Sequence, residues 1–413
     1  MLHKHYYILL GIIFLWSATA YTQEKISLDA YLEKVVVQYP QIKASEKEWE
    51  AVQLEEKIAK MRENPEFEIQ YAHNRESSIF HGPGVESEIA IPIDVWRKRK
   101  TNMQIAFTEV MQAELDYKAQ RAEILHLAKQ IYTQNWIFQE LEKVMDEHFL
   151  SLAELYRKDS IQWSIGTISE MEMKQTKIEK EKAYFEWLEF QNEKIENSLL
   201  FALLIGETHE TFKAVKRDSP KNIPLISWED VADNLWDIKS KDWEISEKEY
   251  SLDLLKKERK ISPEIIAGVE HHFLKDPGDL SKHTETKWTF GVGIPLPFSN
   301  RNKAPLQQQK LKIEQSRWEK EQKIIELQQE WTLLQMRLEQ GKKKIESFER
   351  NILTEGDAWL KQMEKAYERG NISWIEFMYA QNNWRDLHIE YYENLLEYWG
   401  NLHELEWWLE QGD

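Results

Sequence analysis

Cysteine is absent from this 413-residue chain, which excludes disulfides, thiolate metal sites and cysteine nucleophiles. Glycine and proline are scarce, with 14 and 11 residues, and 31% of the residues are charged, so long helices with few turns are expected. Basic charge is also in deficit. Because phosphate binding needs clustered lysine and arginine, the net charge of −18 argues against nucleic acid as a partner.

The short motifs that mark common enzymes are missing as well. The sequence contains no glycine-rich phosphate loop, no G-x-S-x-G elbow and no H-E-x-x-H pair. Neighbouring His271 and His272 would point to opposite faces of a strand, so they cannot hold one metal ion together. We therefore expect no enzymatic activity, no metal site and no cofactor.

Long hydrophobic runs are confined to the N-terminus. Lys4 precedes an apolar run over residues 6–16, and the small-residue site Ala18-Thr19-Ala20 follows. The run is shorter than the roughly 20 residues of a membrane-spanning helix, so residues 1–23 are predicted to be a secretory signal peptide. No later segment is apolar enough for such a helix, so any membrane crossing by the exported protein must use β-strands.

The rest of the chain repeats itself. "ISLDAYLEK" (26–34) is echoed by "ISWEDVADN" 200 residues later, and "GTISEMEM" is echoed by "GNISWIEF" after 204 residues. Similar matches in one order at nearly one offset indicate a duplication. We predict a first repeat over 24–206, a linker over 207–225 and a second repeat over 226–413.

Each repeat follows the same plan of a helix, a β-hairpin and a long helical hairpin. Apolar residues alternate with polar ones in the stretches predicted as hairpins, about 66–95 and 264–297. The helical hairpins are predicted over 97–205 and 305–410. Residues 93–165 contain neither glycine nor proline, and apolar residues recur there at steps of three and four, which is typical of a coiled coil on the order of 100 Å long.

Four strands cannot close a barrel by themselves, because a membrane barrel needs about eight strands and leaves no edge unpaired. Three copies would supply about twelve strands, with apolar side chains outward and polar ones inward. The strand count therefore predicts an oligomer if the strands cross a membrane. The alternative is a soluble β-platform beside a coiled coil.

In its order of motifs the sequence resembles the TolC-type outer-membrane efflux channels over nearly the whole mature chain. "IPLPFSNRNKA" is similar to the proline and F-N-R-N stretch of the heavy-metal branch, often called CzcC- or CusC-like, and "IPIDVWRKRK" is similar to its P-I-E…G-K-R stretch, although Val95 and Trp96 replace small residues. "GNISWIEFMYAQNNW" resembles the G-x-x-S-x-x-E-x-x-x-A-Q signature of the family.

The resemblance implies a mainly α fold with a small β part: four strands per chain in a trimeric 12-stranded outer-membrane β-barrel, continued by an α-helical coiled-coil barrel. It also implies a Gram-negative outer membrane, a homotrimer, a periplasmic adaptor and an inner-membrane resistance-nodulation-division pump. The expected function is a passive exit duct for heavy-metal cations or small toxic compounds. A drug-efflux or type I secretion outlet of the same fold remains open, as does a periplasmic coiled-coil protein without a pore.

The resemblance also assigns residues to the periplasmic end of the duct. Gly166 and Gly370 match the turns at the tips of the helical hairpins, and Glu172 and Glu376 match acids that ring the closed aperture. Tyr367 matches the tip tyrosine. A second family acid is replaced by tyrosine here, so the acidic ring is incomplete. The other interpretation of both glutamates is a solvated carboxylate on a charged helix.

Proline-rich elbows follow the predicted strands. Pro92 and Pro295 stand where a strand would hand over to the long helix, and Pro297 removes another backbone donor from sheet pairing. Asn300 or Asn302 can cap the helix that follows. We expect one such joint in each repeat.

Overall fold

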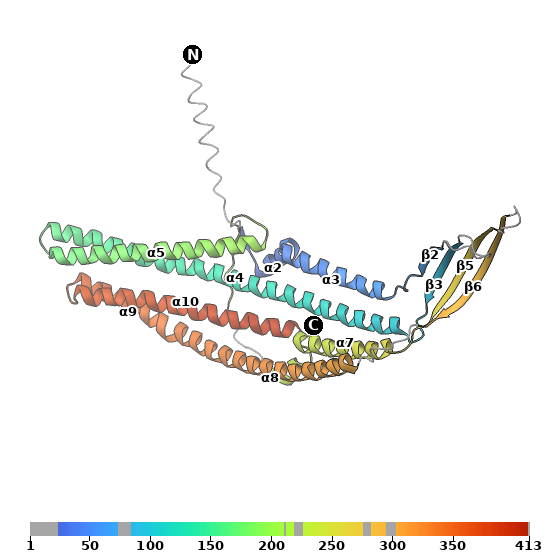
Figure 1. Cartoon of the computed structure of the whole chain (residues 1–413). Helices are drawn as coiled ribbons and strands as arrows, with labels where there is room; N and C mark the ends of the chain where they lie inside the picture. The colour runs from blue at the N-terminus through green and yellow to red at the C-terminus, as the bar shows by residue number, and fades with distance from the viewer. Residues whose placement is uncertain are drawn as a thin grey trace, which may run out of the picture. The chain divides into compact units, whose positions relative to one another are not determined.

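A computed structural model describes residues 24–72, 84–209, 212–218, 226–275, 282–294 and 303–411. The predicted signal peptide lies outside these residues. Within them the chain is mainly helical with a small β part, as the sequence predicts (Figure 1). None of the described helices combines the length and the hydropathy that a membrane crossing requires.

The elements of the first half are β1 (Glu24–Ile26), α2 (Leu28–Gln38), α3 (Pro40–Ala59), β2 (Glu66–Ala72), β3 (Gly84–Pro92), α4 (Lys98–Ser164) and α5 (Glu170–Leu204). Those that follow are β4 (Phe212–Ala214), α6 (Trp228–Ala232), α7 (Trp236–Glu258), β5 (Glu264–Lys275), β6 (Lys282–Gly293), α8 (Lys303–Ser347), the π-helix η1 (Phe348–Ile352), α9 (Leu353–Glu368) and α10 (Trp374–Glu410).

Two compact units make up the chain, and each combines segments from both halves of the sequence. Unit 1 comprises residues 1–44, 119–231 and 328–413, and unit 2 comprises residues 45–118 and 232–327. The long helices α4 and α8 contribute to both units. The exact bounds of the two sequence repeats stay a prediction.

Unit 2 contains a four-stranded antiparallel sheet in the order β2-β3-β5-β6. The hairpin of the first half meets the hairpin of the second half between β3 and β5, where Ile89 faces Ala267. Phe67 pairs with Ile89 on one side and Ala267 with Phe290 on the other, so a single row of residues crosses all four strands. The four predicted strands are confirmed.

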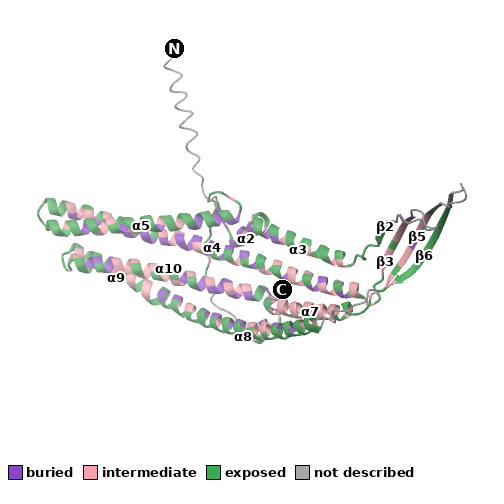
Figure 2. Cartoon of the chain, viewed as in Figure 1, coloured by how far each residue is buried: buried purple, intermediate pink, exposed green. Residues whose placement is uncertain are grey.

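The two faces of this sheet differ sharply, because side chains alternate along each strand. One face is apolar and exposed, and β6 is exposed along nearly all of its described length (Figure 2). Its large exposed side chains are Phe67, Ile69, Tyr71, Ile89, Ile91, Ile265, Phe273, Trp288, Phe290 and Val292. The registers place on the other face Glu66, Glu68, Gln70, Glu86, Glu88, Glu264, Glu270, His272, Glu285 and Lys287.

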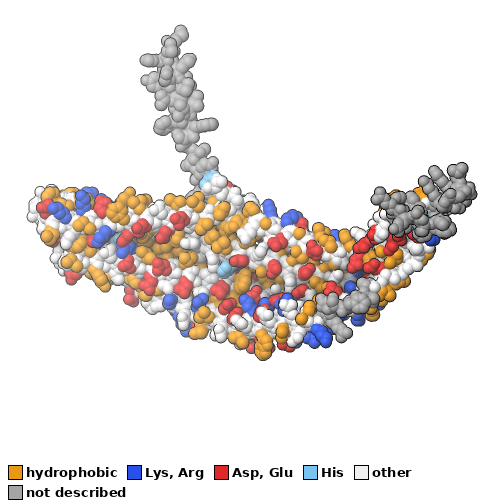
Figure 3. Space-filling model, in the orientation of Figure 1, with side chains coloured by type: hydrophobic (Ala, Val, Ile, Leu, Met, Phe, Trp, Pro, Cys, Tyr) orange, Lys and Arg blue, Asp and Glu red, His pale blue; other side chains and the backbone are white. Residues whose placement is uncertain are grey.

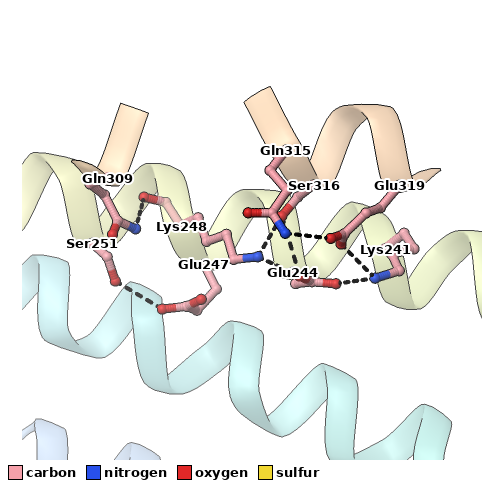
Figure 4. A network of polar contacts seen from close by, with 9 residues as sticks. All are labelled: Lys241, Glu244, Glu247, Lys248, Ser251, Gln309, Gln315, Ser316 and Glu319. Carbon is pink, nitrogen blue, oxygen red and sulfur yellow. Dashed lines mark hydrogen bonds and ion pairs between the residues drawn. The ribbon is translucent and has the colours of Figure 1, made fainter. Parts of the chain in front are cut away.

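Helix α7 of the same unit has no buried residue, and polar contacts join it to α8 (Figure 4). Lys241 Nζ lies 2.7 Å from Glu244 Oε2 and 3.3 Å from Glu319 Oε2. Lys248 Nζ lies 2.5 Å from Glu244 Oε1 and also donates to the buried hydroxyl of Ser316. Hydrogen bonds and ion pairs thus contribute much of what holds these two helices together.

In unit 1 a cluster of buried aromatic rings holds the two short strands β1 and β4 in place. Tyr31 stacks on Phe201 with ring centroids 4.2 Å apart, and the Tyr31 hydroxyl donates to the Phe201 carbonyl at 3.0 Å. Tyr132 Oη donates to the Ile26 carbonyl at 2.9 Å and accepts from the Val215 amide at 2.9 Å. These bonds secure β1 and β4, which pair in parallel beside the buried rings.

The second long helix is less regular than α4. It runs as α8 through Gly341, where a Cβ atom would lie 2.9 Å from Tyr398 Cδ2, so glycine is what lets Tyr398 approach the backbone. Five residues in π-helical conformation then separate α8 from α9. A π-helix inserts an extra residue into the turn, and no hydrophobic period in the sequence reports it.

We predict that Glu244→Gln weakens the α7–α8 contact by about 1 kcal/mol at pH 7, because a carboxylate between two lysines becomes neutral. Burial raises the pKa of Glu244, but Lys241 and Lys248 outweigh it and lower the pKa to about 2. A lowered carboxyl pKa stabilises the fold above its unfolded value near 4.5 and loses that effect as the pH falls toward 2.

Urea unfolding of the wild type and the variant at several pH values measures this difference. The gap in midpoint should be largest above pH 5 and should close between pH 4.5 and about 2. Glu258→Gln, at an exposed position of the same helix outside the network, is the control. A gap independent of pH would contradict the assignment.

Candidate functional site at the turns of the two helical hairpins

Two similar turns reverse the chain in unit 1, one between α4 and α5 and one between α9 and α10. Gly166 and Gly370 have φ angles of 78° and 72°, which favour glycine, and a Cβ atom would meet nothing at either position. Each glycine amide donates to the carbonyl three residues back, at 3.0 and 2.8 Å. The next amide donates five residues back at 2.9 Å in both turns, the bond of a Schellman motif.

The two glutamates assigned to the aperture lie in the first turns of the helices that follow these hairpin turns. Ser169 caps α5 and Ser373 caps α10, and each forms a capping box with the glutamate three residues later. Glu172 Oε2 accepts from the Ser169 amide at 3.0 Å, and Glu376 Oε2 accepts from the Ser373 amide at 2.7 Å. The Ser373 amide and hydroxyl lower the pKa of Glu376, so this exposed carboxylate stays ionised.

Tyr367 packs inside the second hairpin rather than projecting from it. Its ring stacks on Phe377 with centroids 4.9 Å apart and an interplanar angle of 5°. Burial, followed by the negative charges of Asp159 and Glu172, raises the pKa of Tyr367 to about 12. The hydroxyl therefore stays protonated at neutral pH, close to two carboxylates.

A buried polar chain links the two hairpins beside Tyr367. The Trp374 indole Nε1 donates to Thr176 Oγ1 at 2.8 Å, and Thr176 Oγ1 donates to Asp159 Oδ2 at 2.5 Å. Only 1% of Asp159 and none of Thr176 is exposed. Burial raises the pKa of Asp159, the Thr176 hydrogen bond opposes this, and the Glu172 charge adds to the rise. These hydrogen bonds join α4, α5 and α10.

Sequence reasoning missed this polar chain, although one signal was present. Asp159 follows Leu152 and Leu155 at helical spacing, on the face of α4 that is otherwise apolar. A carboxylate in an apolar row indicates a buried polar partner. The sequence could not name that partner. Thr176 lies 17 residues from Asp159, and Trp374 lies 198 residues from Thr176.

A cavity of about 710 Å³ opens beside the turns, between α4 and the α9–α10 hairpin. Glu172, Tyr367 and Gly370 line it together with the buried Asp159. Glu376 is not among its lining residues. The structure thus gathers three of the five residues assigned to the turns and the aperture around one hollow, and Glu376 lies outside it.

Further from the turns, Arg385 of α10 contacts a residue of α4 and a residue of α5. Its Nη1 donates to Glu186 Oε2 at 2.5 Å and lies 3.3 Å from His148 Nε2. His148 is buried, and burial followed by the Arg385 charge lowers the pKa of its imidazole to about 4. The histidine is therefore neutral at physiological pH and can accept from the guanidinium.

The elbow of the first half is described only around Pro92, which is the last residue of β3. Asp94 accepts from the Lys98 and Arg99 amides at 2.6 and 3.0 Å and so caps α4. Trp96 donates to the Ile261 carbonyl at 2.7 Å and ties the elbow to the segment that precedes β5. Pro295, Pro297, Asn300 and Asn302 lie outside the described residues.

Histidines and acids show no metal centre in the described part of the chain. No group of three histidine, aspartate or glutamate side chains converges there. The register puts His271 beside Thr286 on the apolar face, whereas His272 Nε2 lies 2.5 Å from Glu270 Oε1 on the acidic face. The two rings point apart, as their adjacent positions in a strand dictate.

No protein-family model matches the sequence, and no curated protein matches it either. Solved structures do match. A membrane protein from Pseudomonas aeruginosa superposes with a TM-score of 0.77 at 13% identity, over 94% of this chain and 92% of its own. CusC, studied for transmembrane channel formation, gives 0.74 at 13% identity, over 90% of both chains. The Campylobacter jejuni outer-membrane channel CmeC gives 0.72 at 16% identity, over 93% of this chain and 86% of its own.

These likenesses establish the fold. The chain has the TolC-like fold of outer-membrane channel proteins, over nearly its whole length. CusC and CmeC match about equally well, so the fold does not select a branch of such channels.

We predict that Thr176→Val destabilises the junction of the two hairpins by about 1–3 kcal/mol, because Asp159 and the Trp374 indole then lose their partner while buried. Hydrogen exchange of the amides around 367–376 should accelerate, and the midpoint of unfolding should fall. Thr176→Ser keeps the hydroxyl and should retain most of the stability. Equal losses in both variants would mean that the methyl group, not the hydrogen bonds, matters.

Proposed function

We propose that this protein is the outer-membrane outlet of a tripartite efflux system, a passive duct from the periplasm to the exterior of a Gram-negative cell. In this proposal three copies assemble, each giving four strands to a 12-stranded barrel. A periplasmic adaptor and an inner-membrane resistance-nodulation-division pump supply the cargo and the energy, and the duct itself catalyses nothing. The signal peptide predicted for residues 1–23 would direct export.

The four-stranded sheet is the observation that carries the proposal. Among the described strands, β2 and β6 each pair on one side only, so two backbone edges are open. Phe290 is 80% exposed and Trp288 70% exposed on the apolar face. Open edges and large exposed aromatics are costly in water. Both are accounted for when neighbouring copies complete the sheet and lipid covers its apolar face.

The opposite face of the sheet favours cations as cargo. Glu68 lies directly across from Glu88, and Glu86 directly across from Glu270. Like charges in facing positions destabilise a sheet, so their presence suggests a use. In the proposed barrel this face lines the lumen, where carboxylates attract positive ions. The acidic face supports heavy-metal cations or cationic toxic compounds over anions.

Two other functions fit parts of the same structure. A drug-efflux or type I secretion outlet would share the fold, and CmeC, named as an outer-membrane channel, is as similar as CusC. A periplasmic coiled-coil protein without a pore would explain the helices. It would leave the apolar face of the sheet without a role.

Oligomer formation is supported by a second surface, on α5. Met171, Ile178 and Phe185 recur at seven-residue steps and are 71, 55 and 60% exposed. Leu199 lies two further steps along, past Asn192, and Ile195 lies four residues before it; both are more than half exposed. An apolar stripe with a seven-residue period is the contact surface of a coiled coil. The second coiled-coil partner in the proposed trimer is a helix of a neighbouring copy.

We predict that the mature protein, extracted in detergent, is a trimer by light scattering, and that Ile178→Glu with Phe185→Glu shifts it toward monomers. The substitutions place charges in a contact that is otherwise apolar. Lys365→Glu, an exposed position of α9 outside this stripe, is the control and should stay trimeric. A monomer that is soluble without detergent would remove the outlet proposal.

The turns of the helical hairpins are proposed as the periplasmic aperture, with Glu172 and Glu376 as its acids and Tyr367 as a packing residue behind them. Both glutamates are exposed and fixed by their capping boxes, so each presents a carboxylate in a defined position. Fixed carboxylates at a constriction favour the passage of cations.

Glutamine substitutions separate this role from capping, because glutamine can also complete a capping box. Glu172→Gln with Glu376→Gln should lower the ratio of cation to anion permeability in planar bilayers while the melting temperature stays within about 2 °C. Glu193→Gln, an exposed glutamate further along α5, should change neither quantity. Unaltered selectivity in the double variant would leave both residues as caps only.

A further inference from the structure

A second hollow lies next to the one beside the turns, within unit 1, and shares Glu147, Ser151, Glu364 and Gln381 with it. It has a volume of about 570 Å³ and is lined by α4, α9 and α10. This size falls within the range of small-molecule sites, roughly 300–1,000 Å³. Neither the turns nor the strands of the proposed duct contribute to it, so the outlet function does not account for its composition.

Aromatic rings and a fixed carboxylate form one side of the groove. Trp384 and His388 lie with ring centroids 4.3 Å apart, and Tyr392 lies on the same helix. The Trp384 indole Nε1 donates to Asp357 Oδ1 at 2.7 Å, which holds the carboxylate of α9 at the ring edge. His388 Nε2 is 3.8 Å from the same oxygen. A flat apolar surface is thus placed next to a negative charge.

The remaining charges make the groove acidic. Glu140, Glu147 and Glu364 line it with Asp357, against Lys143 and Lys361. Lys143 Nζ is already engaged by Glu140 at 2.8 Å. Burial, followed by the charges of Glu140 and Glu147, raises the pKa of Tyr392 to about 12, so the phenol that lines the groove stays neutral at pH 7. A ligand that enters the groove is therefore favoured if it is cationic.

Gln381 contributes an acceptor that the described protein leaves unused. The residue is 5% exposed and lines the groove, and its Nε2 donates to Ser151 Oγ at 2.6 Å. Its carbonyl Oε1 is buried and has no hydrogen-bond partner among the described residues. A buried acceptor without a donor costs about 1–3 kcal/mol, so an N–H donor from a ligand would recover that energy.

We propose that this groove binds a protonated organic amine with an apolar or aromatic body. The body lies on Trp384, where a cation gains from the ring face as well as from Asp357. An ammonium N–H donates to Gln381 Oε1. A quaternary ammonium offers charge but no N–H, so it should bind less tightly. The inference stands apart from the outlet function, because binding can be measured without transport.

Isothermal titration calorimetry with phenethylamine, in matched detergent at pH 7, tests the proposal on the full mature protein. We expect saturable binding, and weaker binding of the trimethylated analogue. Asp357→Asn should weaken phenethylamine roughly tenfold, which corresponds to ~1.4 kcal/mol. Glu355→Gln, an exposed carboxylate near the start of α9 outside the groove, is the matched control and should bind like the wild type.

Gln381→Met tests the acceptor itself. It should remove the preference for phenethylamine over its trimethylated analogue and leave the analogue's affinity unchanged. Circular dichroism melts of each variant show whether the fold is intact, and Trp384→Leu gives a second route to lost affinity. No saturable binding, equal binding by Asp357→Asn and Glu355→Gln, or binding only to dissociated monomers would overturn the proposal. The last result would mean that a second copy covers the groove.

Discussion

Unpaired backbone at the two outer strands of the sheet is the constraint on which the other features depend. A strand edge needs hydrogen-bond partners, and among the strands that the structure describes β2 and β6 find them on one side only. In the proposed oligomer neighbouring copies complete that sheet. The apolar face would then meet lipid, and the acidic face would line the lumen. The exposed stripe on α5 is the second surface that the proposed oligomer would cover. The helical charge pattern fits such packing, with acidic and basic side chains interspersed among hydrophobic ones (Figure 3).

The hairpin turns show how one residue can serve two needs. Glu172 and Glu376 satisfy amides at the starts of α5 and α10, and the same bonds hold their carboxylates still. Behind the turns, Asp159 is buried in the helix packing and held by Thr176. The proposed aperture is therefore built on a junction whose polar atoms are mutually satisfied, which favours a single arrangement of the two hairpins.

Local rules predicted much of this structure, and long-range pairing supplied the rest. Period-two stretches located the strands, and glycine followed by serine located both turns, because αL geometry and N-caps are encoded within a few residues. The partner of Trp96, at Ile261, and that of Trp374, at Thr176, are set by how the two halves pack, which no local pattern records. The π-helix at Phe348–Ile352 is likewise a response to packing.

The short parallel pair of β1 and β4 has a consequence for the order of events during biogenesis. β1 begins at Glu24, and its partner strand begins at Phe212, in the segment that connects the two halves. The first strand that the structure describes therefore waits for its partner until the chain has been synthesised as far as residue 214. If the chain is exported as proposed, release of the signal peptide predicted for residues 1–23 would set the moment at which this strand is free to pair.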